Sequence, residues 1–265
     1  TSTAVTQCSF SSWYRKFRAH TFASKIIPLP VAFVEFLLAD GIVVEQGRPS
    51  CVEQPLLDTS DSETESNDGE DDTETLRSTS FPTLEAQVAE AIQQLGGAVF
   101  PKLNWSAPKD AAWIATTRNL HCTTYADILL LMKSSDVVVH DLVHAYDDCQ
   151  AASSPTDVAS PVLVLRQWQT MNPAHEFRCF VRDGCVVAIS QRDMAHYAFL
   201  EPVQQRAIDA IRQFHADVTS QFALSEFVFD VYFEQLEQSH SMIKLVDFAP
   251  WGGTTNPLLF SWEEL

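Results

Sequence analysis

Two short apolar segments near the end of the chain each carry a single aspartate. Asp230 lies within Phe227–Phe233, and Asp247 lies within Ile243–Phe248. Both segments are rich in β-branched and aromatic residues, and a polar stretch separates them. This pattern predicts a β-hairpin with one acid on each strand.

The register of this hairpin decides whether the two acids meet. If Phe233 pairs with Lys244, Asp230 lies directly opposite Asp247, with Cβ atoms roughly 4.5–5.5 Å apart and like charges repelling each other. Apolar flanks would bury this repulsion, so the pair has to be neutralised. A hard cation such as Mg²⁺ neutralises two acids and usually arrives with substrate phosphates. We therefore predict a magnesium–nucleotide site, the alternative being that one aspartate caps the loop in a shifted register.

A turn rich in glycine follows the second strand. Residues 249–257 cannot continue the strand, because Pro250 lacks a backbone donor and the two glycines after Trp251 favour unusual dihedral angles. Such a turn lets the backbone approach a ligand closely. It supports a ligand site beside the paired aspartates.

The acidic residues are distributed unevenly along the chain. The 265 residues have a formal net charge of −18, and half of this charge lies in Asp58–Thr75, which holds nine acids and no base. Serine and threonine fill the gaps of this stretch, so it cannot build a core and we expect it to be disordered. The acidity also argues against nucleic acid as a partner, because phosphate contacts need a basic surface.

Cysteine spacing and hydropathy bear on the location of the protein. The six cysteines are scattered without a C-x-x-C pair, which favours reduced thiols over a zinc site or a disulfide framework. No apolar run reaches the roughly 18 residues that span a bilayer. We therefore expect a cytoplasmic protein without a membrane partner.

Helix and strand patterns follow one another irregularly, which favours an α+β fold over a regular βαβ array. We expect helices from Pro30 to Gly41, from a Thr83 cap to Gly96-Gly97, over Tyr125–Lys133, and over Glu201–Phe222. We expect strands at Val99–Leu103, Val137–His140, Val162–Trp168 and on both sides of Asp183-Gly184.

A second polar stretch, Asp147–Ser160, predicts a hinge between two lobes. Residues 1–57 and 76–150 are then expected to form an N-terminal lobe. Residues 58–75 would be a disordered insert, and residues 151–265 would form a C-terminal lobe that carries the metal-binding hairpin.

Several long blocks of the chain resemble a single protein family. They leave out little besides the acidic stretch and comprise residues 8–14 (CSFSSWY), 26–30 (IIPLP), 100–110 (FPKLNWSAPKD), 176–181 (EFRCFV), 189–193 (ISQRD), 227–232 (FVFDVY) and 245–265. These blocks look like the cell division cycle protein 123 family. The resemblance implies an ATP-grasp-like fold with the nucleotide cleft between two lobes, binding of ATP with Mg²⁺, and a role in assembling eukaryotic translation initiation factor 2 through its gamma subunit.

The resemblance also implies a set of nucleotide-binding residues. Lysines of the first lobe would contact the α and β phosphates, and Lys109 is favoured over Lys102 because a proline-braced loop aims it. The backbone of residues 165–168 would meet the adenine, and charged residues would line the cleft. The implied set is Lys102, Ala107, Lys109, Arg166, Gln167, Trp168, Glu176, Arg178, Arg192, Asp230 and Asp247, with Asp230 and Asp247 as metal ligands.

The turn at Asp183-Gly184 limits which arginine can reach the cleft. With a regular two-residue turn, Arg178 pairs with Ile189, and Arg192 falls on the opposite face from Arg178. Either a bulge intervenes, or only one arginine reaches phosphate from this sheet. Arg178 is the firmer candidate, because an arginine inside a strand of Phe and Val needs an anionic partner.

One residue departs from the family pattern. The family has Asp-x-Asn at the second acid, where the asparagine adds an oxygen ligand to the metal, and this chain has Asp247-Phe248-Ala249. Alanine supplies no oxygen, although water can replace a lost ligand because Mg²⁺ commonly keeps several waters. We therefore expect a weaker or degenerate metal site.

Three functions stay open on these grounds. The whole-chain resemblance favours an ATP-binding assembly chaperone. The alternatives are an ATP-grasp ligase, which joins a carboxylate to an amine through an acylphosphate, and a degenerate module that binds its partner without nucleotide. Because one scaffold hosts many functions, the fold cannot separate them, and turnover of ATP stays open.

Overall fold

The computed structural model describes residues 1–39, 80–149, 158–236 and 242–265. The stretch 58–75, expected to be disordered, lies outside the described residues. The α-helices are α1 (Ser2–Gln7), α2 (Phe10–Phe17), α3 (Val31–Leu38), α4 (Pro82–Gln94), α5 (Tyr125–Lys133), α6 (Asp136–Val143) and α7 (Gln204–Asp217). The 3₁₀ helices are η1 (Lys109–Ile114), η3 (Pro173–His175), η4 (Ala198–Val203) and η5 (Thr219–Gln221). The strands are β1 (Ser24–Pro28), β2 (Val99–Lys102), β3 (Val162–Gln167), β4 (Glu176–Arg182), β5 (Cys185–Gln191), β6 (Phe227–Phe233) and β7 (Ile243–Pro250).

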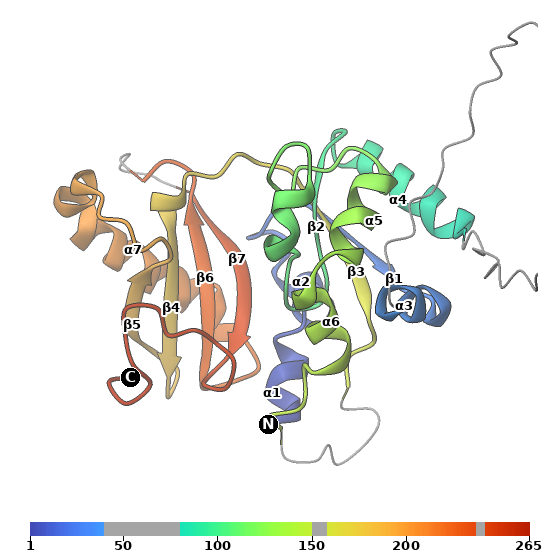
Figure 1. The fold of residues 1–265 in the computed structure, drawn as a ribbon. Coiled ribbons are helices and arrows are strands. Elements are labelled where there is room, and N and C mark those ends of the chain that lie inside the picture. Colours follow the sequence, from blue (N-terminus) through green and yellow to red (C-terminus); the bar gives the residue numbers. More distant parts are fainter. Residues whose placement is uncertain (40–79, 150–157, 237–241) are drawn as a thin grey trace, which may run out of the picture.

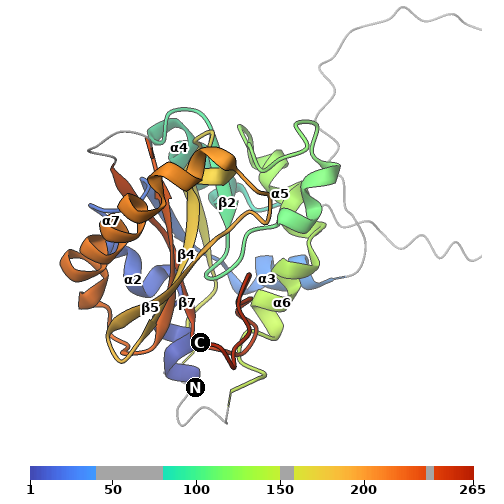
Figure 2. The same cartoon turned by 90° about the vertical axis from the view of Figure 1, so that its left-hand side faces the viewer.

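The strands form two antiparallel sheets, which lie side by side (Figure 1). One sheet has the order β1-β3-β2 and the other has the order β5-β4-β6-β7. Figure 2 shows α7 on one side of the four-stranded sheet and α5 and α6 on the other. The fold therefore mixes helices with antiparallel sheets, as the irregular sequence pattern predicts. None of the described helices is long and apolar enough to cross a bilayer.

Each sheet has its own hydrophobic core. The core of the four-stranded sheet includes α2, whose Trp13 and Phe17 contact Phe248 with ring centroids 5.4 and 5.2 Å apart. β3 lies between β1 and β2, and its residues alternate between the two cores. Leu163 and Leu165 enter the core of the three-stranded sheet, and Val162 and Val164 enter the core of the four-stranded sheet. The packing thus crosses the expected boundaries between lobes. The aromatic face of α2 and the four apolar residues that begin β3 are placed by burial and not by their position in the chain.

A bulge shifts the register of the hairpin formed by β4 and β5. Asp183-Gly184 forms the predicted two-residue turn, with φ of 51° and 73°. β5 then contains one extra residue, Val187, opposite the regular strand β4. Arg178 consequently pairs with Ser190, one residue later than in a regular ladder. Of the two alternatives left open by the sequence, the bulge is the correct one, and it brings Arg192 to the face of Arg178.

The hairpin formed by β6 and β7 contains the predicted pair of acids. Asp230 lies directly opposite Asp247. The expected register at the hairpin end is wrong by one residue, since Phe233 pairs with Ile243 and not with the residue after it. A bulge beside Asp230 absorbs this difference. The register of β6 and β7 could not be predicted from the length of the loop between them, because a bulge adds a residue without changing the apolar pattern.

The strand expected at Val137–His140 is wrong, because these residues lie in α6. A run of three valines favours a strand by propensity. Ser135, however, caps the segment as a helix, since its hydroxyl accepts a hydrogen bond from the backbone of Val138 at 3.2 Å. Capping and burial of one helix face therefore outweigh the propensity of the β-branched residues.

Two expected helix boundaries also differ. α4 does not use Thr83 as its cap; Pro82 occupies its first turn and Phe81 precedes it. The expected helix Glu201–Phe222 is divided into η4, α7 and η5, with Pro202 inside η4. Proline removes a backbone donor, so the regular α-helix begins only after it. α5 has the predicted bounds, and Thr124 and Asp127 form a capping box at its start.

Candidate functional site

Four charged side chains gather on one face of the four-stranded sheet, opposite to the face that packs against α7. Glu176 and Arg178 are two residues apart on β4 and point to the same face, and Asp230 on β6 pairs with Arg178. Asp247 continues this row on β7. Alternate residues of a strand point to the same face. The register of three strands therefore brings together charges that are far apart in the sequence.

Arg178 and Asp230 form a bidentate ion pair. The Nε and Nη2 atoms of Arg178 donate to the two carboxylate oxygens of Asp230 at 2.8 and 2.9 Å, and Nη1 donates to the backbone oxygen of Asn256 at 2.7 Å. Burial raises the pKa of Asp230, but Arg178 and Arg192 outweigh it and hold the pKa below its ordinary value. The anionic partner that the sequence demands for Arg178 is therefore Asp230.

Arg192 joins the same cluster from the end of β5. Its Nη1 lies 3.1 Å from Asp230 Oδ2, and its Nε lies 3.3 Å from Glu176 Oε1. Its backbone N–H also donates to the carbonyl of Glu176 at 2.9 Å. Burial raises the pKa of Glu176, and Arg192 opposes this effect. Both arginines thus reach the charged face, which a regular hairpin would not permit.

Lys102, at the end of β2, forms an ion pair with Asp247 across the two sheets. The side chain of Lys102 is 2% exposed and that of Asp247 is 21% exposed. Burial lowers the pKa of Lys102, although Asp247 opposes this effect. The favoured role of Lys109 at the phosphates stays a prediction, and Lys102 is the lysine that forms an ion pair with the acid pair. Sequence spacing cannot reveal this ion pair, because the contact depends on how the two sheets face each other.

Arg166 is a second connection between the sheets. Its Nη2 donates to the backbone oxygen of Val246 at 2.8 Å. Its guanidinium carbon lies 5.4 and 5.6 Å from the ring centroids of Phe10 and Phe22, so the cation is enclosed by two aromatic rings. Val246 is the extra residue of the bulge in β7. Sequence reasoning missed Val246, because it acts through its backbone and its side chain carries no signal.

A cavity of about 100 Å³ lies beside the cluster, at the end of β3. It is lined by Phe22, Phe100, Lys109, Arg166, Gln167, Trp168, Gln169, Met171, Glu176 and Val246. Lys109 is exposed, and its charge favours the ionised forms of Glu176 and Asp230. Ala107 packs against the core of the three-stranded sheet, and its carbonyl accepts from the backbone of Lys109 at 2.7 Å. Ala107 therefore positions the Lys109 loop and does not line the cavity.

The acid pair suits a metal that needs few protein ligands. Asp230 and Asp247 offer hard carboxylate oxygens, but the described part of the chain has no group of three or more His, Cys, Asp or Glu residues that could hold a metal. Mg²⁺ keeps several waters and takes oxygens from substrate phosphates. The donor set therefore fits Mg²⁺ with a phosphate and does not fit a cage made of protein ligands alone.

Ala249 lies two residues after Asp247 on the same face and lines a second cavity, of about 300 Å³, with Arg178 and Asn256. The side-chain Oδ1 of Asn256 accepts from the backbone of Leu258 at 2.8 Å, and its backbone oxygen accepts from Arg178. Asn256 is therefore engaged elsewhere and does not replace the oxygen that alanine lacks.

Comparisons with known proteins cover almost the entire chain. The D123 family model matches residues 13–265. The translation initiation factor eIF2 assembly protein of Emericella nidulans is 42% identical over 98% of this chain and 64% of its own length. The protein of the same name in Xenopus tropicalis is 42% identical over 98% of this chain and 78% of its own length. The chain thus spans just under two thirds of the length of the fungal relative.

Two solved structures are similar along the whole chain. C-terminally truncated Cdc123 from Schizosaccharomyces pombe has a TM-score of 0.79 and 36% identity, covering 100% of this chain and 91% of that chain. A second structure of Cdc123 from the same organism has a TM-score of 0.76 and 37% identity, covering 98% of this chain and 90% of that chain. At this identity, the likeness concerns sequence as well as fold.

Proposed function

We propose that this chain, which belongs to the D123 family, the family of cell division cycle protein 123, binds ATP with Mg²⁺. We also propose that it assists the assembly of translation initiation factor eIF2 in the cytoplasm. The arrangement of charges supports the nucleotide part of this proposal. Three cations, Lys102, Arg178 and Arg192, contact the facing pair Asp230 and Asp247.

This cluster matches the needs of a phosphate chain. An arginine fork donates to two oxygens at once, and a lysine acts as a point charge. In the structure, Lys102, Arg178 and Arg192 neutralise Asp230 and Asp247. When a phosphate chain binds, its oxygens would become the anionic partners of these three cations. Mg²⁺, when bound, would compensate the two aspartates and the phosphate oxygens together. Every buried charge then keeps a partner, so the exchange avoids the penalty of an isolated buried charge.

The cavity beside the cluster supports a site for the base. Its walls are largely apolar and aromatic, with Phe22, Phe100 and Met171 around the polar side chains Gln167 and Gln169. Binding sites for small molecules commonly combine an apolar lining with a few polar groups that fix orientation. The cavity adjoins Glu176 and Lys109, so a base held there would direct its phosphates toward the charged cluster.

The assembly role is supported by the names of the relatives, which are called eIF2 assembly proteins in Emericella nidulans and Xenopus tropicalis. We propose the gamma subunit as the direct partner from the family resemblance. The acidic character of the chain supports a protein partner over nucleic acid, because a negative surface repels phosphates. In this role the nucleotide shapes a docking surface, and turnover is not required.

Ala249 favours a second candidate, in which the chain binds its partner without nucleotide. The residue supplies no oxygen beside the acid pair, and Asn256 is engaged elsewhere. A chain that had lost its metal could keep the ion pairs of Lys102 and Arg178 as purely structural contacts.

Calorimetric titration with ATP separates the two candidates. We expect saturable binding in the presence of Mg²⁺ and much weaker binding with EDTA, because the metal joins the phosphates to the aspartates. Absence of binding in both conditions would contradict the nucleotide proposal and favour the second candidate. Release of ADP, followed during the same incubation, should be slow or absent for a chaperone.

Binding of the purified gamma subunit tests the partner. We expect a stable complex with the gamma subunit alone, and a faster formation of the complete heterotrimer when this protein is added. A complex with another isolated subunit, and none with gamma, would contradict the choice of partner while leaving the nucleotide proposal intact.

A further inference from the structure

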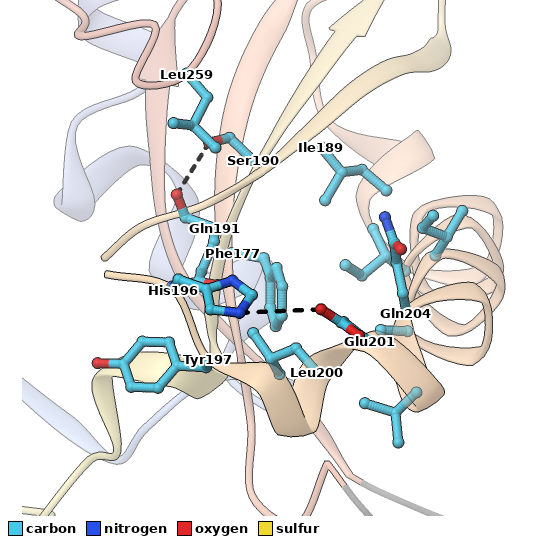
Figure 3. Close-up of a pocket in the computed structure, with 14 residues that line it drawn as sticks. Phe177, Ile189, Ser190, Gln191, His196, Tyr197, Leu200, Glu201, Gln204 and Leu259 are labelled. Atoms are coloured by element: carbon cyan, nitrogen blue, oxygen red, sulfur yellow. Dashed lines mark hydrogen bonds and ion pairs between the residues drawn. The ribbon is translucent and has the colours of Figure 1, made fainter. Parts of the chain in front are cut away.

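A pocket of about 270 Å³ opens at the outer edge of β5 (Figure 3). Its floor is formed by Phe177 and Ile189, and one wall is formed by Leu200 of η4 and Ile211 of α7. Leu259, which is 60% exposed, lines it from the other side of β5. The floor residues alternate with the charged residues along their strands, so the floor of the pocket lies on the opposite face of the sheet from the charged cluster.

The backbone of β5 presents hydrogen-bonding groups at this pocket that do not pair with β4. β5 is the outermost strand of its sheet and, among the described strands, pairs with β4 alone. The backbone of Arg192 donates to Glu176, so the neighbouring pair Phe177–Gln191 is a non-hydrogen-bonded pair of the antiparallel ladder. The N–H and C=O groups of Gln191, and by alternation those of Ile189, therefore point away from β4.

Two features define how much of this edge is open. Val187, the bulge residue, interrupts the ladder toward the turn and is 50% exposed. Bulges commonly prevent the pairing of an edge strand. At the other end, the hydroxyl of Ser190 donates to the carbonyl of Gln191 at 2.9 Å, a contact that a backbone N–H of another strand could replace. The open part of the edge is therefore Ile189–Gln191, directly beside the pocket.

The rim of the pocket is negative. Among its lining residues Glu201 is the one carboxylate, and none is lysine or arginine. The side chain of Glu201 is 74% exposed and lies 3.9 Å from that of His196, which is 77% exposed. Such a solvated contact contributes little, so Glu201 can pair with another cation. The net charge of −18 further attracts basic partners.

We infer that this edge and its pocket dock an extended segment of a partner polypeptide. The segment pairs its backbone with Ile189 and Gln191, places a Leu, Ile or Met side chain over Phe177, and places a Lys or Arg beside Glu201. Addition of a strand to a free edge provides affinity through the backbone, and pockets for alternate side chains provide specificity. The chain's own stretch 58–75 does not fit this description, because its nine acids would repel Glu201. The inference goes beyond the proposed function and does not depend on nucleotide.

Methyl NMR of the complete chain with a defined peptide tests this inference. The probe is the blocked heptapeptide Thr-Val-Thr-Leu-Thr-Lys-Thr, in which leucine and lysine share one face of a strand. We expect saturable shifts of the methyl groups of Ile189, Ile208 and Ile211, with weak affinity typical of a short peptide. In an antiparallel pairing, the leucine and lysine that face the pocket lie directly opposite Ile189 and Gln191, and their own N–H groups point toward the edge. A peptide with N-methylated leucine and lysine should therefore bind less. No saturable shift up to about 5 mM peptide, which corresponds to roughly 3 kcal/mol, would overturn the inference.

Variants on the exposed surface of α7 provide matched controls. Gln204→Trp should fill the mouth of the pocket and weaken binding by roughly tenfold or more, because it occupies the site of the anchor. Gln213→Trp introduces the same bulk on the same helix away from the pocket and should change nothing. Equal affinity in both variants would overturn the inference. Thermal unfolding of the variants confirms that each is folded.

A charge exchange tests the rim. Glu201→Lys should weaken binding of the lysine peptide by roughly two- to fivefold, the range of an exposed ion pair. The same variant should strengthen binding of a peptide that carries glutamate in place of lysine. If Glu201→Lys weakened both peptides equally, the predicted pairing of a basic residue with Glu201 would be wrong.

Discussion

Lys102 of β2 and Asp247 of β7 form an ion pair that joins the three-stranded sheet to the four-stranded sheet. The same aspartate lies opposite Asp230, whose charge is compensated by Arg178 and Arg192. Asp230 thus has two cations and Asp247 has one, all from outside the hairpin, and these cations offset the repulsion between the two aspartates. A metal that binds the pair has to compete with Lys102 for Asp247.

Replacement of Lys102 by methionine tests this competition. Lys102→Met should lower stability without metal, because Asp247 then faces Asp230 without its cation. The loss should stay below the roughly 3–5 kcal/mol of a fully buried pair, since Asp247 remains 21% exposed. Mg²⁺ alone should raise the Tm of the variant more than that of the parent, because the metal no longer displaces an ammonium group.

Lys25→Met is the matched control for this experiment, because Lys25 is an exposed lysine on β1. It should leave the response of Tm to Mg²⁺ unchanged. An identical response in the parent and in Lys102→Met would show that the metal does not take the place of Lys102 at Asp247.

Asp230 should make stability depend on pH at the acidic end. Burial raises its pKa, but Arg178 and Arg192 outweigh this effect, and the folded-state pKa lies below the ordinary value. A lowered pKa contributes stability that is present above the unfolded value of about 3.9 and is lost as pH falls through the folded value. Asp230→Asn should therefore cost the most free energy of unfolding near neutral pH and progressively less below about pH 4. Urea unfolding across this range measures the difference, and a constant cost at every pH would contradict it.

The same substitution distinguishes a metal ligand from a structural residue. If Asp230 holds Mg²⁺, Asp230→Asn should weaken ATP binding when magnesium is present and have little effect in EDTA. An equal loss in EDTA would assign Asp230 a structural role, as the partner of Arg178 and Arg192.

The acid pair could be predicted from sequence because its evidence is local. One aspartate in each of two apolar strands, with a polar loop between them, predicts that the acids meet across a hairpin. The structure has Asp230 opposite Asp247, although a bulge beside Asp230 shifts the register at the hairpin end. The bulge in β5 could be stated only as an alternative, because an extra residue in a strand leaves the apolar pattern unchanged. Its effect on the site is large all the same, since it decides on which face Arg192 lies.

The contacts between the sheets could not be predicted, because they depend on tertiary packing. Lys102 in a short strand resembles an ordinary solvated lysine, and only the approach of β2 to β7 makes it the partner of Asp247. The aromatic rings of Phe10 and Phe22 enclose Arg166, although they come from the beginning of the chain. No spacing rule connects residues that belong to separate elements and meet through burial alone.

Deletion of Asp58–Thr75 should leave the fold and the nucleotide affinity intact. These residues carry nine like charges and lie outside the described part of the chain. A stretch of this composition buries little apolar surface, and closure of a shorter loop changes stability only slightly. A thermal unfolding scan and the ATP titration measure both effects, and a large fall in Tm would show that the acids pack against the body of the protein.

Ala249→Asn should strengthen nucleotide binding. Ala249 lies on the same face as Asp247 and lines a cavity of about 300 Å³, so an asparagine finds room beside the acid pair. Its amide oxygen would supply the ligand that the family pattern has at this position. Contacts with charged groups contribute about 1.5–3 kcal/mol, so the affinity for ATP should rise on the order of tenfold or more.

The gain should depend on magnesium, since the new oxygen acts through the metal. Ala249→Leu adds comparable bulk without an oxygen and should give no gain, which separates coordination from packing. If Ala249→Asn gave no gain while Asp230 and Asp247 were still required for ATP binding, water or another side chain would already fill the position. If the parent bound no ATP and the variant gained none, the cations Lys102, Arg178 and Arg192 would have only structural partners. The chain would then be a module that binds its protein partner without nucleotide.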